Sequence, residues 1–117
     1  MRNKSVMFYD KIYGVYVRVS FGIKYKDFKE VVKKVFNKDI EQGCGIESDG
    51  MTQAFITKDN KTCFWVWTEN EDVGVLIHEL THVAFRVINE RGVTFGASGE
   101  ALCYYLAYLY NEFIDEY

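Results

Sequence analysis

The sequence of 117 residues contains no proline, two histidines and three cysteines. Without proline, the turns of the chain must rest on glycine, asparagine and aspartate. The cysteines, Cys44, Cys63 and Cys103, stand at wide spacings that form neither a disulfide framework nor a paired-cysteine zinc motif. We therefore expect free, partly buried thiols and no structural disulfide.

Long apolar runs and basic stripes are also missing. No stretch approaches the roughly 20 apolar residues that a membrane span needs, and Tyr9, Asp10 and Lys11 interrupt the start of the chain where an export signal would be apolar. The net charge is −3, and the lysines of residues 24–38 are mixed with acidic residues. We therefore expect a cytoplasmic protein that binds neither nucleic acid nor membranes.

Apolar and aromatic residues are abundant, at 49% and 17% of the chain. A chain of this length can bury one core that covers about two-thirds of its unfolded surface. The composition therefore predicts a single folded domain over residues 1–117, with no linker or repeat.

The first half of the chain reads as strands around one helix. Residues 5–9 and 12–22 alternate in polarity and predict strands, which a bend near Gly14 could fold into a hairpin. Residues 25–38 place apolar side chains at helical spacing. A loop at 43–50 then leads to two β-rich runs on either side of Asp59, Asn60 and Lys61, which predict a hairpin.

The second half predicts two helices. The first begins after Thr68 or Asn70, with Thr68 and Glu71 as a capping box, and ends near Gly92. The second runs from about Gly99 to the end, with Ser98 as its N-cap, and its apolar face carries Leu102, Leu106, Leu109 and Phe113. The order of strands and helices predicts an α+β domain.

Both histidines, His78 and His82, fall on the first of these helices in the run HELTH. Positions i and i+4 of a helix lie one above the other, so two imidazoles can bind one metal ion. Glu79 is poorly placed as a ligand beside them, but it can take a proton from a water molecule that zinc polarises. This arrangement is the basis of the HExxH motif of zinc hydrolases. The alternative is that the motif arose by chance and that the two histidines are ordinary polar residues on a helix surface.

Two histidines do not complete a catalytic zinc site, which normally has three protein ligands. The chain has no third histidine, so the third ligand must be Asp, Glu or Cys. Glu100, in the first turn of the next helix, is the best candidate, because an antiparallel helix pair would bring that turn back beside the histidines. The alternative is that Glu100 binds no metal and is favoured at the start of the helix by the helix dipole. Cys103, one turn further on, is the second candidate ligand.

The pattern HELTH followed by GE at 99–100 resembles the gluzincins, zinc peptidases with two histidine ligands and a glutamate on a following helix. The resemblance covers roughly residues 52–117. Within the family, the chain is similar to minimal members such as the minigluzincins and the small phage or prophage HExxH proteins. It implies a small zincin-like domain with one zinc ion held by His78, His82 and Glu100, with Glu79 as the general base. The hairpin would supply an edge strand for an extended peptide. Tyr104 stands where the family often has an aspartate.

The sequence therefore predicts a zinc-dependent peptidase that acts on a peptide or protein substrate. Two alternatives stay open. One is a zinc-stabilised binding or regulatory module that does not hydrolyse its partner, and the other is a metal-free structural domain with an accidental HExxH.

Overall fold

The computed structural model describes residues 5–37, 49–93 and 99–117. Seven elements follow one another along the chain: β1 (Ser5–Asp10), β2 (Val15–Ser20), α1 (Tyr25–Phe36), β3 (Gly50–Ile56), β4 (Thr62–Thr68), α2 (Val73–Glu90) and α3 (Glu100–Glu116). The predicted α+β class and order of elements are confirmed. Most of the loop expected at 43–50 lies outside the described residues, as do Ser98 and Cys44, whereas Gly50 already belongs to β3.

The four strands form one mixed sheet in the order β1-β2-β4-β3. Two antiparallel hairpins, β1–β2 and β3–β4, are joined through a parallel pairing of β2 with β4. Their turns use residues that tolerate a left-handed backbone, Gly14 with φ 75° and Asn60 with φ 63°. Among the described residues, β3 is consequently an edge strand that pairs with β4 on one side.

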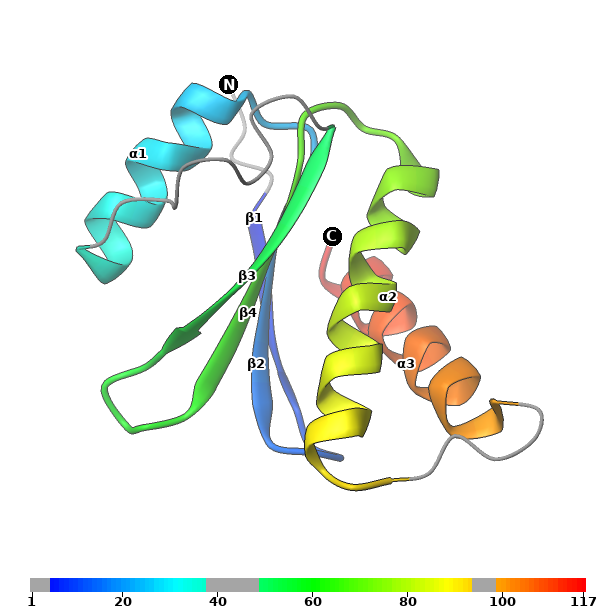
Figure 1. Ribbon diagram of the computed structural model, residues 1–117. Coiled ribbons are helices and arrows are strands. Elements are labelled where there is room, and N and C mark those ends of the chain that lie inside the picture. The colour runs from blue at the N-terminus through cyan, green and yellow to red at the C-terminus, as the bar shows by residue number, and fades with distance from the viewer. Residues whose placement is uncertain (1–4, 38–48, 94–98) are drawn as a thin grey trace.

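The helices cover the two faces of the sheet unequally (Figure 1): α1 lies against one face, and α2 and α3 lie together against the other. Alternating side chains explain this division, because successive residues of a strand point to opposite faces. On β4, Phe64 and Val66 pack in the core beneath α2 and α3, whereas Trp65 and Trp67 pack against Phe28 of α1. The sheet is thus buried on both sides around β4.

The start of α2 differs from the prediction. Its N-cap is Asp72, whose side chain accepts a hydrogen bond from the backbone N–H of Val75 at 3.3 Å. Thr68 ends β4 instead, where its hydroxyl donates to the carbonyl of Asn70 and accepts from the backbone N–H of Gly22. The proposed capping box of Thr68 and Glu71 is therefore wrong. The end of the helix is as predicted, with Gly92 at φ 71°.

Helix α3 buries a face that includes a tyrosine. Tyr105, Leu109 and Phe113 are its buried residues, while Leu102 and Leu106 are partly buried. The Tyr105 hydroxyl donates to Oδ2 of the fully buried Asp10 at the end of β1. Oδ1 of Asp10 accepts from the backbone N–H groups of Ile12 and Tyr13, so one carboxylate holds both the hairpin turn and α3.

Two expectations from composition concern thiols and membranes. Cys63 is buried, Cys103 is exposed, and both are free. In the part of the chain that the structure describes, no helix has the length and apolar character needed to cross a lipid bilayer.

Candidate functional site

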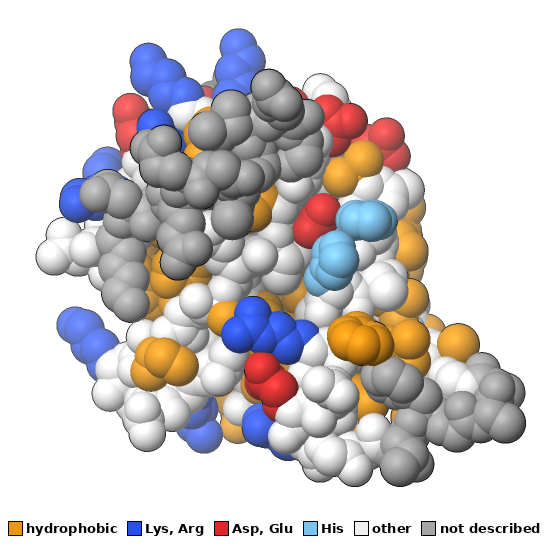
Figure 2. Space-filling view, viewed as in Figure 1, with side chains coloured by type: hydrophobic (Ala, Val, Ile, Leu, Met, Phe, Trp, Pro, Cys, Tyr) orange, Lys and Arg blue, Asp and Glu red, His pale blue; other side chains and the backbone are white. Residues whose placement is uncertain are grey.

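The two histidines lie side by side on the exposed face of α2 (Figure 2). Their ring centroids are 4.9 Å apart and the ring planes meet at 84°. The helix explains the pairing, because four residues advance the chain by slightly more than one turn and keep both side chains on one stripe. The opposite stripe of the same helix, with Leu76, Leu80 and Val83, is buried in the core.

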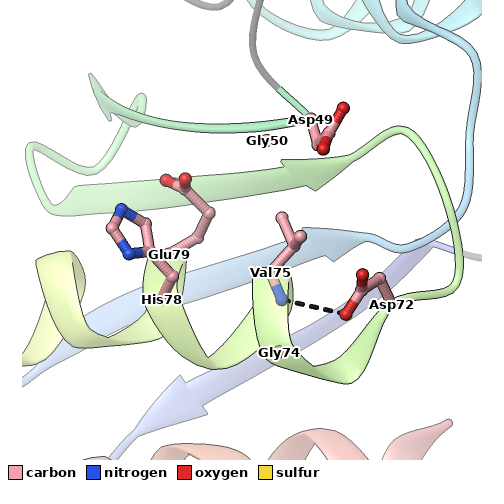
Figure 3. A pocket seen from close by; sticks show the side chains of 7 residues that line it. All are labelled: Asp49, Gly50, Asp72, Gly74, Val75, His78 and Glu79. Atoms are coloured by element: carbon pink, nitrogen blue, oxygen red, sulfur yellow. Dashed lines mark hydrogen bonds between the residues drawn. The ribbon is translucent and has the colours of Figure 1, made fainter.

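Glu79 lies between the histidine stripe and the sheet. Its side chain is 7% exposed, although it follows His78 directly. Figure 3 shows the carboxylate and the His78 ring on the side of α2 that faces β3. Thr52 of β3 donates a hydrogen bond from Oγ1 to Oε1 of Glu79 at 2.7 Å. A buried carboxylate is costly unless it is hydrogen-bonded, and this bond provides a partner.

Two adjoining pockets border these residues, and together they line the space between α2 and β3. The first has a volume of about 440 Å³ and is lined by Asp49, Gly50, Asp72, Gly74, Val75, His78 and Glu79 (Figure 3). The second has a volume of about 640 Å³ and is lined by Gly50, Met51, Thr52, Glu79, His82, Phe85, Arg86, Asn89 and Glu90. Because Gly50 and Glu79 line both, we treat the two pockets as one groove, the α2–β3 groove.

The two ends of the α2–β3 groove differ in chemistry. The end near the start of α2 carries the carboxylates of Asp49 and Asp72. The other end carries Phe85, which is 49% exposed, and Arg86, whose Nε lies 3.1 Å from Oε2 of Glu90. The groove therefore has negative charge at one end and an apolar ring with an ion pair at the other.

The spacing of the histidine rings fits a shared zinc ion. A zinc–nitrogen bond of 2.0–2.1 Å places each ring centroid roughly 3.2 Å from the metal, and a tetrahedral angle then separates the centroids by about 5 Å. The observed separation is 4.9 Å. The distance between the two rings is therefore compatible with two nitrogen ligands on one ion.

The remaining predicted ligands stand apart from this pair. Among residues 5–37, 49–93 and 99–117, no group of three or more His, Cys, Asp or Glu side chains is gathered so that it could hold a metal ion. Glu100 is exposed as the first residue of α3, and Cys103 is exposed one turn later. The structure brings together His78, Glu79 and His82, and the assignment of the third ligand stays a prediction. Tyr104 is 72% exposed.

Sequence reasoning did not find the β3 side of the site. Thr52 is hydrogen-bonded to Glu79 and Gly50 lines the groove beside it, yet neither residue belongs to a recognised motif. The alternation of the strand places positions 50 and 52 on the same face, but it does not show that this face meets α2. Asp72 could have been found as an aspartate directly before the apolar periodicity of the helix begins.

Comparison of the chain with protein-family models, curated proteins and solved structures finds no match.

Proposed function

We propose that the chain is a cytoplasmic, zinc-dependent peptidase of the gluzincin type. The observation that carries the proposal is the His78–His82 pair, at a ring separation that suits one zinc ion, beside a groove that Glu79 lines. His78 and His82 would hold the metal. Glu100 is the proposed third ligand, although among the described residues it is not gathered with the two histidines, so the start of α3 would have to move towards them when the metal binds. Free thiols at Cys63 and Cys103 are consistent with a reducing compartment.

The proposed mechanism assigns separate roles to the metal and to Glu79. Zinc, when bound, polarises a water molecule and lowers its pKa towards neutrality. Glu79 takes the proton of the attacking water, because its carboxylate lies in the groove directly after a ligand histidine. The same carboxyl group can then return the proton to the leaving amine.

The edge strand provides a way to hold the substrate. Strand β3 pairs with β4 on one side and borders the α2–β3 groove at Gly50, Met51 and Thr52. An extended peptide can add to such an edge through main-chain hydrogen bonds, which bind without requiring a particular side-chain sequence. A peptide or protein substrate fits this arrangement better than a compact small molecule.

A substitution of Glu79 by Gln tests the general base. Glutamine keeps the shape but cannot accept the proton, so hydrolysis should fall by about 10²–10⁴-fold while zinc stays bound. The measurement is hydrolysis of casein or a quenched peptide library, together with zinc content of protein purified without a histidine tag or added metal. Chelator is the control. Wild-type activity in Glu79→Gln would rule out this mechanism.

A substitution of Glu100 by Ala tests the third ligand. Zinc affinity and activity should fall together, because a zinc site loses much of its affinity with one of its three protein ligands. Glu116→Ala is the matched control, since Glu116 is an exposed glutamate at the other end of α3. Unchanged zinc affinity in Glu100→Ala would reject the assignment. A zinc-loaded wild-type chain that hydrolyses no peptide would favour the non-catalytic binding module.

A further inference from the structure

The buried position of Glu79 depends on strand β3. The side chain of Glu79 is 93% buried by the packing around it, as its exposed fraction of 7% shows. Thr52 meets it twice from β3: Oγ1 lies 2.7 Å from Oε1 and 3.2 Å from the carbonyl oxygen of the same residue. A hydroxyl has one proton, and a charged acceptor at shorter distance makes the stronger bond. The proton of Thr52 is therefore directed to Oε1.

Gly50 allows the strand to approach this closely. A β-carbon at position 50 would lie 2.8 Å from Cγ1 of Val75 and 3.1 Å from Cγ of Glu79, which is too near for ordinary packing. Positions 50 and 52 point to the same face of β3. The absence of a side chain at 50 and the hydroxyl at 52 thus act on the same glutamate from the same strand.

We infer that Thr52 is a positioning residue for the general base. Its hydroxyl fixes Oε1 of Glu79, so that Oε2 is the oxygen that accepts the proton from water. This inference rests on the proposed peptidase function. Among the described residues, the Thr52 hydroxyl is the side-chain donor to this carboxylate. Fixing one oxygen orients the other, and orientation of a reacting group contributes directly to the rate.

Two variants separate the hydroxyl from the shape of residue 52. Thr52→Val removes the hydroxyl and keeps the branched shape, whereas Thr52→Ser keeps the hydroxyl. Thr81→Val is the matched control, because Thr81 lies on α2 and donates to the carbonyl of Ile77 at 2.7 Å, within the helix. Thr52→Ala serves as a second hydroxyl deletion if the valine variant does not fold.

The kinetic expectation is a fall in kcat without a matching change in KM. Thr52→Val should lower kcat about tenfold, since a hydrogen bond to a charged group is lost. Thr52→Ser should retain kcat within about threefold, and Thr81→Val should match wild type. Zinc affinity should stay the same in all three, because Thr52 contacts the base and not a proposed ligand. A Thr52→Val enzyme with wild-type kcat would overturn the inference.

A second readout does not depend on activity. In metal-free protein with ¹³C-labelled glutamate, the carboxyl signal of Glu79 is assigned by its absence in Glu79→Gln. At one fixed alkaline pH, this signal should move in Thr52→Val and stay in place in Thr52→Ser and Thr81→Val. An unmoved signal in Thr52→Val overturns the inference even if the chain is an active peptidase. If the signal moves but the chain, when loaded with zinc, hydrolyses no peptide, the contact between Thr52 and Glu79 stands, whereas the peptidase proposal is overturned and the positioning role goes with it.

Discussion

At the scale of single residues, His82 gives a direct test of the metal pair. Replacement by Ala leaves His78 without its neighbour 4.9 Å away, so tight zinc binding should be lost. A ligand at 100 times its dissociation constant stabilises the native state by about 2.7 kcal/mol. Zinc should therefore raise the melting temperature of the wild type and not of His82→Ala.

Wild-type protein treated with chelator is the control, and it should melt close to the His82→Ala variant. Thermal unfolding with and without zinc, together with metal analysis, provides the measurement. Full zinc occupancy in His82→Ala would remove this histidine from the site.

The sequence predicts those residues of the site whose relative positions are set within a single helix. His78, Glu79 and His82 follow from helix periodicity alone, and the structure brings them together. Thr52 and Gly50 depend on which strand lies opposite α2 and on its register, which no local pattern specifies. Glu100 depends on the placement of one helix against another, so it stays a prediction.

At the scale of elements, the contact between β3 and α2 is set at Gly50. Gly50→Ala should destabilise the fold by about 1–3 kcal/mol, the usual cost of overpacking. The added carbon would meet Val75 and the backbone oxygen of Trp67, which lies 3.0 Å away. Urea unfolding measures the change.

Gly74→Ala is the matched control for this experiment. A β-carbon there would lie 3.2 Å from Oδ1 of Asp72, a contact that a shift of a few tenths of an ångström relieves. In addition, alanine is the better helix former. A larger loss of stability in Gly74→Ala than in Gly50→Ala would contradict this account of the close approach.

The elements themselves were predicted well because each depends on local periodicity. Both hairpins and all three helices form near the expected residues, and Gly92 ends α2 as expected. The differences from the prediction arise where a side chain bonds to a residue that is distant in the sequence. The hydroxyl of Thr68 accepts a hydrogen bond from the backbone N–H of Gly22, and Asp72 caps α2 instead. Tyr105 is buried although it was not part of the predicted apolar face of α3, and its hydroxyl donates a hydrogen bond to Asp10, which lies far away in the sequence.

At the scale of the whole molecule, burial links stability to alkaline pH. Burial raises the pKa of the Cys63 thiol to about 11, with Arg18 opposing the shift, and burial and the hydrogen bond to Asp10 raise the pKa of Tyr105. An unfolded thiol loses its proton near pH 9 and an unfolded phenol near pH 10. Above these values the unfolded chain is deprotonated first, so the free energy of unfolding should fall as pH rises.

Urea unfolding in reductant over a pH series measures this fall. The decline should begin at about pH 9, at up to about 1.4 kcal/mol per pH unit for each group, and steepen at about pH 10. Cys63→Ala should remove the first part of the slope and Tyr105→Phe should reduce the second. The comparison uses slopes, since each variant also changes stability at neutral pH. A slope unaffected by either substitution would reject the assignment.

The parallel pairing of β2 with β4 has a consequence for the order of folding. Each hairpin closes a short loop, whereas the register of Val19 with Val66 joins segments separated by α1 and β3. Closing a long loop costs chain entropy before its contacts form, and non-local pairing slows folding. The two hairpins can therefore form early and separately, and the joining of β2 to β4 becomes the slow step. Because β3, β4 and α2 follow one another along the chain, both walls of the α2–β3 groove belong to the half of the molecule that lies after this long connection.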